Sequence, residues 1–264
     1  VGEDAVFDAA CARAGLLRVR NVMELRAVSQ AFLKFGSVAG PRLGVITATG
    51  ACGIMAADAC EDYGLELAPA PRRLAEELEN PHIAWHRLSN PVDIWPLGMV
   101  GGSFTRVFKD AARILLESDR VDAVLGIAPA LTSPFHEDLD MAATIREVQA
   151  VNSGQKPVAL WLYGDGLVQK MQELANEPGV ACFPSIDEAV MGLAGMVRYQ
   201  KLQQQAMGLR EEAVEGRQAE SQARISLPAG GLLVGESALA LLNDYQIPVA
   251  DWSLEKSAAS AAQR

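Results

Sequence analysis

The chain has 264 residues, of which 50% are hydrophobic and 21% charged, a composition typical of a folded protein with a sizeable core. Its formal charge of −10 and its isoelectric point near 4.9 argue against nucleic acid and anionic membranes as partners, because both require clustered Lys and Arg. No apolar run reaches the roughly 20 residues of a membrane span, and the first residues show no basic region followed by an apolar core. We therefore expect a cytoplasmic protein that binds neither nucleic acid nor membrane.

The cysteines and histidines do not form a metal-ligand pattern. The cysteines are scattered, without a CxxC pair, and predict reduced thiols; they are Cys11, Cys52, Cys60 and Cys182. His82 and His86 are four positions apart, but Pro81 and the loop-like sequence around it argue against a helix that would bring both to one ion. His136 is interpreted as a surface residue. No metal site is predicted.

Residues 1–36 are predicted to be the tail of a domain whose body lies upstream of Val1. This piece is too small to fold alone. Gly15 is a natural helix stop, and Asn21 is predicted to cap the following helix, with Glu24 in the third position of a capping box. The expected elements are a helix at 4–14, a strand at 16–19 and a helix at 21–35.

Residues 40–200 are predicted to form one complete domain, which follows the linker GSVAGP at 36–41. Strands and helices alternate five times, and the strand at 121–130 is almost continuously apolar, as in a parallel sheet covered on both faces. We expect an α/β doubly wound parallel sheet with the flavodoxin-like strand order. A long, proline- and glycine-rich loop is expected at 80–102, where long loops are usually functional. The other expected strands are 43–47, 65–68, 158–163 and 180–183.

The C-terminal part of the chain changes character twice. Residues 201–229 are polar and charged and are predicted to be a helical linker, because they cannot bury much apolar surface. Residues 230–264 contain a short amphipathic helix at 236–245, followed by a strand start. They are interpreted as the first steps of another domain.

The turn at 48–53 is the strongest candidate site. It joins the first strand of the complete domain to a helix that ends at Gly64. Gly50 and Gly53 allow a ligand to approach the backbone closely, and free amides together with the helix dipole favour an anion there. An ordinary strand-to-helix turn is the alternative. Cys52 is read as a small residue that fits the turn rather than as a reactive thiol.

Five segments in this order resemble the NDP-forming (ADP-forming) acyl-CoA synthetases, which are relatives of succinyl-CoA synthetase. The segments are GEDAVFDAACARAGLLRV, LGVITATGACGIMAADACEDYGLELA, NPVDIW, FPSIDEAVMGLAGMVRY and ESALALLNDYQIPV. The resemblance covers nearly the whole chain. It implies that 1–36 is the C-terminal end of a first flavodoxin-like domain, that 40–200 is a complete succinyl-CoA synthetase-like domain and that 230–264 begins an ATP-grasp domain.

The resemblance implies an acid–thiol ligase that converts an acid, CoA and ATP into acyl-CoA, ADP and phosphate through an acyl phosphate and a phosphohistidine. The family's histidine lies in a Ser-His-Thr-Gly segment expected upstream of Val1, so this chain is expected to hold no catalytic residue and to be inactive alone. CoA, ATP/ADP and Mg are implied to bind mainly outside it. The implied partners are a small-molecule acid and the synthetase's other domains or subunits, and a homo-oligomer is an open alternative.

The same resemblance assigns the anion site to the phosphohistidine. The residues implied to bind its phosphoryl group are Thr49, Gly50, Ala51, Cys52 and Gly53, with Asn90 and Asp93 supporting the neighbouring loop. The family pattern Thr-Asn-Ala-Gly-Gly-Pro-Gly is kept at Thr47, Gly50 and Gly53, and lost at Ala48, Ala51 and Cys52. The loss of an amide side chain at Ala48 leaves the backbone donors intact.

Two other classes of function stay open from the sequence. The first is a non-catalytic regulatory or interaction module with a synthetase-like fold. The second is a free-standing flavodoxin-like domain that binds FMN or another phosphate ligand. The acid substrate, the choice between ADP and GDP, and the oligomeric state are not determined by the residues.

Overall fold

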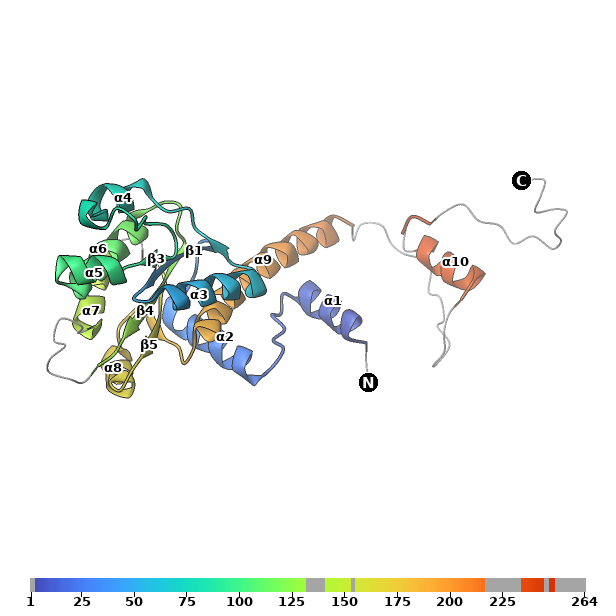
Figure 1. The fold of residues 1–264 in the computed structure, drawn as a ribbon. Helices are drawn as coiled ribbons and strands as arrows, with labels where there is room; N and C mark the ends of the chain where they lie inside the picture. The colour runs from blue at the N-terminus through green and yellow to red at the C-terminus, as the bar shows by residue number, and fades with distance from the viewer. Residues whose placement is uncertain (1–2, 132–140, 153–154, 217–233, 245–246, 250–264) are drawn as a thin grey trace. The chain divides into compact units, whose positions relative to one another are not determined.

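A computed structural model describes residues 3–131, 141–152, 155–216, 234–244 and 247–249 (Figure 1). The chain divides into two compact units, Val1–Met207 and Gly208–Arg264. The second unit contains the end of α9 (Ile186–Gly216) and one further described helix, α10 (Glu236–Asp244), close to the helix expected there. Within the described residues, no helix is both long and apolar enough to cross a membrane.

The first unit is built on parallel strands with helices between them. The strands are β1 (Arg42–Thr47), β2 (Glu66–Leu67), β3 (Val92–Asp93), β4 (Ala123–Pro129), β5 (Val158–Tyr163) and β6 (Val180–Cys182). The helices are α1 (Asp4–Ala14), α2 (Val22–Phe35), α3 (Gly50–Tyr63), α4 (Arg72–Leu78), η1 (Pro81–Ile83), α5 (Trp95–Gly101), α6 (Phe104–Glu117), α7 (Met141–Val151), α8 (Leu167–Leu174) and α9 (Ile186–Gly216).

The strand order of the sheet is β2-β1-β4-β5-β6, and β3 also pairs with β1. All five pairings are parallel. Without the two-residue β3, this is the order 2-1-3-4-5 of flavodoxin-like folds, so the predicted fold class is confirmed. β4 lies at the centre and pairs over its length with β1 and β5, with Leu125 opposite both Val45 and Ala159.

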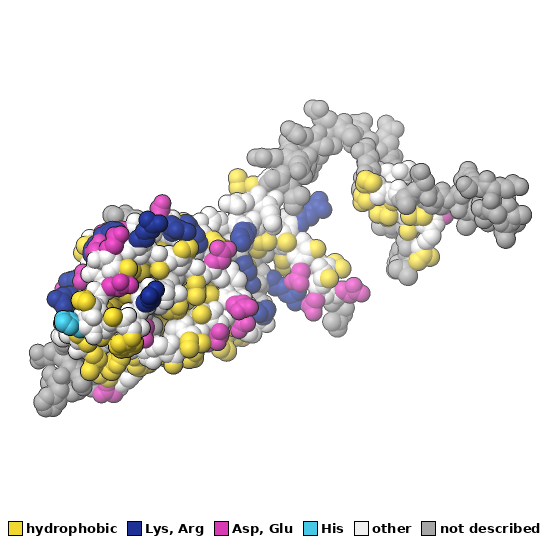
Figure 2. Space-filling view, turned by 45° about the horizontal axis from the view of Figure 1, so that its top comes forward, with side chains coloured by type: hydrophobic (Ala, Val, Ile, Leu, Met, Phe, Trp, Pro, Cys, Tyr) yellow, Lys and Arg dark blue, Asp and Glu magenta, His cyan; other side chains and the backbone are white. Residues whose placement is uncertain are grey.

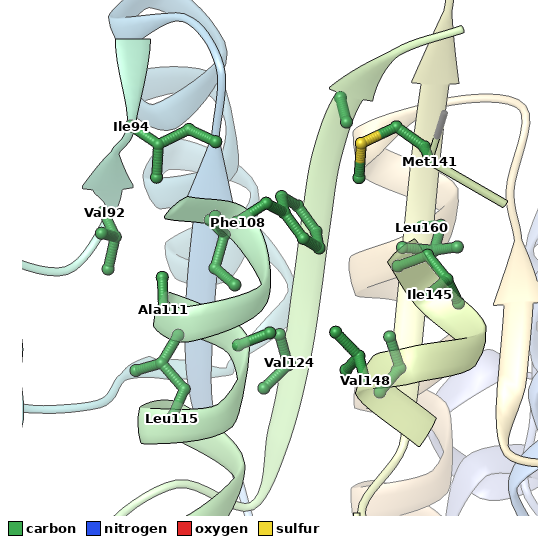
Figure 3. Packing of buried hydrophobic residues seen from close by; sticks show 14 of the residues in the cluster. Val92, Ile94, Phe108, Ala111, Leu115, Val124, Met141, Ile145, Val148 and Leu160 are labelled. Carbon is green, nitrogen blue, oxygen red and sulfur yellow. The ribbon is translucent and has the colours of Figure 1, made fainter. Parts of the chain in front are cut away.

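Each face of the sheet is covered by a separate layer of helices, because side chains alternate between the faces along a strand. On one face α5, α6 and α7 cover Ile46, Val124 and Leu160. Figure 3 shows side chains of α6 and α7 packed over this face. On the other face α2, α3 and α9 cover the alternate strand residues; those in the central three strands are Leu43, Val45, Ala123, Leu125, Ile127 and Ala159.

Polar side chains cap the first turns of α2 and α6. The Asn21 side chain accepts a 2.9 Å hydrogen bond from the Glu24 N–H at the start of α2, as predicted. The Glu24 carboxylate turns back and accepts a 2.6 Å bond from the Arg20 N–H, one position before the cap. Ser103 caps α6 in the same way by accepting from the Arg106 N–H at 3.3 Å. These bonds satisfy donors that the first turn of a helix leaves free.

Two predicted features are wrong. Residues 16–19 form no strand, because the hydrogen bonds of an extended segment need a neighbouring strand, and none pairs with them in the part of the chain that the structure describes. Residues 80–102 are not one long loop, since they contain η1, β3 and α5. β3 is too short to show periodicity, and α5 contains Pro96 and two glycines, so its packing against α6 outweighs its poor propensity.

Candidate functional site

The turn at 48–53 lies at the carboxyl edge of the sheet, where β1 and β4 are neighbours. The helix that follows β1, α3, covers one face of the sheet, and α7, which follows β4, covers the other. The Ala48 N–H donates to the carbonyl oxygen of Ile127 at 3.1 Å and joins the two strand ends. Such a switch point is where open α/β sheets bind ligands, because the chains leaving the two strands diverge.

The start of α3 presents backbone donors that are not used internally. Thr49 is the N-cap, in an extended conformation, and its side chain makes no capping hydrogen bond. The Gly53 N–H donates to the Thr49 carbonyl at 3.3 Å. The N–H groups of Gly50, Ala51 and Cys52 have no acceptor among the residues that the structure describes. Free donors and the positive end of the helix dipole together make this turn able to hold an anion.

A buried threonine at the end of β1 fixes the backbone of the turn through two hydrogen bonds. Thr47 is fully buried, and its hydroxyl donates to the Thr49 carbonyl at 2.7 Å while accepting from the Thr49 N–H at 3.1 Å. Gly53 packs closely beside it, because an added Cβ would lie 3.3 Å from the Thr47 Cγ2 and 3.2 Å from the Pro91 Cβ. This close approach explains why a glycine stands at position 53.

Asn90 replaces missing backbone pairing between strands. Its side-chain oxygen accepts a 2.8 Å hydrogen bond from the Val45 N–H in β1. Its side-chain nitrogen donates to the carbonyl oxygens of Leu43 and Ala68, both at 2.8 Å. One amide side chain therefore satisfies three backbone groups and ties the segment before β3 to β1.

Asp93 brings a carboxylate to the start of α3. It lies opposite Thr47 in the pairing of β3 with β1, and its Oδ1 accepts from the Trp95 N–H at 3.0 Å. Its Oδ2 would lie 3.3 Å from a Cβ built on Gly50. A carboxylate here is favoured by the helix dipole and repels a second anion. The carbonyl oxygen of Asp93 also lies 2.9 Å from His86 Nε2.

The thiol at position 52 is half-buried rather than activated. Burial raises the pKa of the Cys52 thiol above its ordinary 9.0. Tyr163, at the end of β5, has a pKa raised first by its own burial and then by the Cys52 charge nearby. Its ring packs on Trp161, with centroids 5.4 Å apart. A raised thiol pKa lowers reactivity at neutral pH, so Cys52 acts as a packing residue.

The histidines and acidic residues do not converge on an ion. His82 is in η1, and His136 lies outside the described residues. Among the residues that are described, no group of three or more His, Cys, Asp or Glu side chains is placed to hold a metal. The site is therefore a set of backbone donors with one flanking carboxylate.

Sequence reasoning missed two contributors to this edge of the sheet. Trp161 and Tyr163 were read only as strand residues, although Tyr163 directly precedes a Gly-Asp-Gly turn at the carboxyl end of β5. The position of a residue at a strand end is a usable signal, because all parallel strands place that end at the same edge. The three hydrogen bonds of the Asn90 side chain could not be predicted in this way, because their backbone partners in Val45, Leu43 and Ala68 are distant in sequence.

The chain is an α/β protein with a flavodoxin-like sheet, and the start of α3 presents free backbone amides at the switch point of that sheet. The sequence profile of the Ligase-CoA domain family matches residues 43–207, so this chain belongs to that family. The match runs from the first strand into α9 and includes the turn at the start of α3, whereas α2 precedes it. The resemblance to acyl-CoA synthetases expected from the sequence motifs is confirmed by this match and by the relatives.

Several curated relatives are ADP-forming acetate–CoA ligases. Ligase II of Archaeoglobus fulgidus is 34% identical over 124 residues, covering 47% of this chain and 18% of the relative. Ligase I of the same organism is 28% identical over 259 residues, covering 97% of this chain and 35% of the relative. The alpha subunit of ligase II of Pyrococcus furiosus is 25% identical over 76% of this chain and 42% of its own length. This chain thus spans less than half of these relatives.

Solved structures show the same fold. The apo form of dinucleotide forming acetyl-coenzyme A synthetase 1 from Ca. Korarchaeum cryptofilum superposes with a TM-score of 0.65 at 21% identity, over 78% of this chain and 44% of that one. The complex of that synthetase with phosphate and ADP gives a TM-score of 0.66 at 20% identity, over 79% and 43% of the two chains.

Proposed function

We propose that this chain supplies the Ligase-CoA domain of an NDP-forming acyl-CoA synthetase, an acid–thiol ligase. The reaction joins a carboxylic acid to CoA and releases ADP and phosphate from ATP, through an acyl phosphate and a phosphohistidine. Family membership and the names of the relatives support this proposal. Because the chain spans 35% of a relative that it matches over 97% of its own length, CoA and ATP/ADP are assigned to parts of the synthetase outside it.

The role we assign to this chain is electrostatic. The observation that carries it is the set of unused N–H groups at Gly50, Ala51 and Cys52, at the switch point of the sheet. Phosphoryl transfer depends mainly on positioning and charge stabilisation, which pre-oriented amides supply without rearranging. The histidine comes from another part of the synthetase, and the α3 start holds its phosphoryl group. Mg, like CoA and ATP/ADP, is assigned mainly to parts of the synthetase outside this chain.

The anion site can be tested on the chain itself. Titration with inorganic phosphate, followed by ¹⁵N-resolved amide spectra, should shift the Gly50, Ala51 and Cys52 signals before those of other residues. Gly50→Pro removes one donor at the first helical position, where proline is tolerated and the extended Thr49 can precede it. Gly50→Ala is the matched control, since it adds a Cβ beside Asp93 but keeps the N–H.

The catalytic role needs the complete synthetase. There Gly50→Pro should lower kcat by about a hundredfold, the usual cost of removing one pre-oriented backbone donor, while Gly50→Ala should stay within about threefold. The 264-residue chain alone should form no acyl-CoA from acid, ATP and CoA. Equal rates for the two variants, or acyl-CoA formed by the chain alone, would contradict the assignment.

A non-catalytic module is the second candidate. The observation that favours it is the Asp93 carboxylate beside Gly50, which already places a negative charge at the helix start. A synthetase in which the family's histidine is replaced, and in which Gly50→Pro changes only stability, would support the module.

A further inference from the structure

Tyr163 ends β5 on the face of the sheet that α3 covers. Ile127 of β4 pairs with Thr47 of β1 on one side and with Trp161 of β5 on the other. Tyr163 is two residues beyond Trp161, so its side chain points to the same face, one step closer to the carboxyl edge. Tyr163 and Cys52, in the first turn of α3, both pack against the buried cluster of that face. The Tyr163 ring therefore lies on the same side of the sheet as the free amides, at the level where α3 begins.

The turn that follows Tyr163 fixes the position of this residue. The Ala130 N–H donates to the Tyr163 carbonyl at 2.7 Å, and the Gly166 N–H donates to the Ala130 carbonyl at 2.8 Å. Gly164 has a φ of 123°, and an added Cβ there would lie 2.5 Å from the Ala130 carbonyl oxygen. Glycine is needed for so close an approach. The Trp161 ring packs against that of Tyr163 with centroids 5.4 Å apart, so the phenol is held in place before a ligand binds.

The hydroxyl of Tyr163 is an unused hydrogen-bond donor. It makes no hydrogen bond with any residue that the structure describes, and it is not sealed from solvent, because it is absent from the buried polar atoms that lack a partner. Burial of the side chain, and after it the charge of Cys52, raises the pKa of the Tyr163 phenol above its ordinary 10.0. The phenol therefore keeps its proton at neutral pH and can donate a hydrogen bond to an anion. The influence of Cys52 also places the first turn of α3 near this phenol.

We propose that the Tyr163 hydroxyl donates a hydrogen bond to the phosphoryl group held at the start of α3, as a further binding residue of that site. The inference rests on the proposed function. The amides of Gly50, Ala51 and Cys52 approach a phosphoryl group along the axis of α3. The phenol approaches from β5, across β4, whereas Asp93 lies in β3 on the other side of β1.

Donors from two directions can bind different oxygen atoms of a tetrahedral anion. A chloride ion held by the amides has no second atom that could reach the phenol. Tyr163 therefore makes the turn selective for phosphoryl groups over monatomic anions.

The test compares the native chain with Tyr163→Phe, which removes the hydroxyl and keeps the ring on Trp161. Each is titrated with inorganic phosphate and, separately, with sodium chloride at constant ionic strength, and the amide signals of the α3 start are followed. Tyr163→Phe should weaken phosphate binding about fivefold to tenfold, as expected for the loss of one hydrogen bond, and leave chloride binding unchanged. Tyr63→Phe, at the far end of α3, is the matched control and should change neither affinity.

The outcomes separate the role of Tyr163 from the proposed function. Each variant is first checked for an unchanged thermal midpoint. If phosphate binds Tyr163→Phe as tightly as the native chain, the role of Tyr163 is overturned and the anion site stands. If phosphate and chloride are weakened alike, α3 has been displaced rather than a donor lost, and the role of Tyr163 is again overturned. If phosphate does not bind the native chain, the anion site fails and the role of Tyr163 fails with it.

Discussion

The side-chain oxygen of Asn90 accepts a 2.8 Å hydrogen bond from the backbone N–H of Val45, in the middle of β1. The same amide group donates to the carbonyl oxygens of Leu43 and Ala68. A single side chain thus completes the pairing of β1 where no strand backbone reaches it. This relationship holds the segment that carries Asp93 against the start of α3.

Replacement of Asn90 by Ala should destabilise the fold by about 2–4 kcal/mol, because it leaves the Val45 N–H and the Ala68 carbonyl without partners. The Leu43 carbonyl loses one donor but still accepts from the Ala68 N–H at 2.9 Å. Urea unfolding, with a fixed m-value, measures the change. Asn80→Ala is the control, since Asn80 caps only the short η1 through the His82 N–H. A loss no larger than that of the control would contradict this account of Asn90.

Glu24 should make stability depend on pH in the acid range. Burial alone raises the pKa of Glu24, but hydrogen bonds from the Arg20 N–H and from Arg198 outweigh it and hold the pKa below the ordinary 4.5. A depressed pKa adds stability that is complete above about 4.5 and is lost as the pH falls through the folded value. Glu24→Gln should therefore flatten the stability profile below pH 4.5, measured by urea unfolding at several pH values. If the stability of Glu24→Gln falls below pH 4.5 as steeply as that of the native chain, the ion pair of Glu24 with Arg198 does not stabilise the fold.

Gly98 in α5 should not tolerate a side chain. A Cβ at this position would overlap the ring of Phe104, with the Phe104 Cγ only 2.7 Å away. Gly98→Ala should cost about 1–3 kcal/mol despite the higher helix propensity of Ala. Gly101→Ala, in the same helix, meets nothing closer than the Arg106 guanidinium at 3.5 Å and should be neutral or stabilising by about 0.5 kcal/mol. Thermal unfolding of both variants measures the two changes in stability. If Gly101→Ala destabilises the fold as much as Gly98→Ala does, the packing of Gly98 against Phe104 is contradicted.

Asp93 should weaken anion binding at the α3 start. Asp93→Asn keeps an acceptor for the Trp95 N–H but removes the negative charge beside Gly50. The affinity for inorganic phosphate should rise about fivefold, since a charge at this range contributes about 1 kcal/mol. Asp58→Asn, on the exposed side of α3, is the control for net charge. If both variants bind phosphate equally, the carboxylate does not act on this turn.

The amino-acid sequence by itself determined the α/β class, the flavodoxin-like order, the family and the position of the α3 turn. These features rest on local patterns that survive without tertiary contacts: the continuous apolar run of β4, the caps at Asn21 and Ser103, and the glycines at 50 and 53. The domain boundaries and the phosphohistidine role of the turn stay predictions.

Only the tertiary structure decided the secondary structure of residues 80–102 and the side chains that surround the turn at 48–53. β3 exists because the Thr47 carbonyl of β1 accepts from the Ile94 N–H and because Asn90, just before β3, bonds to the Val45 N–H of β1. α5 exists because Gly98 fits against Phe104. The Asp93 carboxylate reaches Gly50 through a pairing between segments more than 40 positions apart. Such contacts depend on groups distant in sequence, so no local periodicity records them. The sequence thus placed free donors at the turn, and the tertiary structure placed a negative charge beside them.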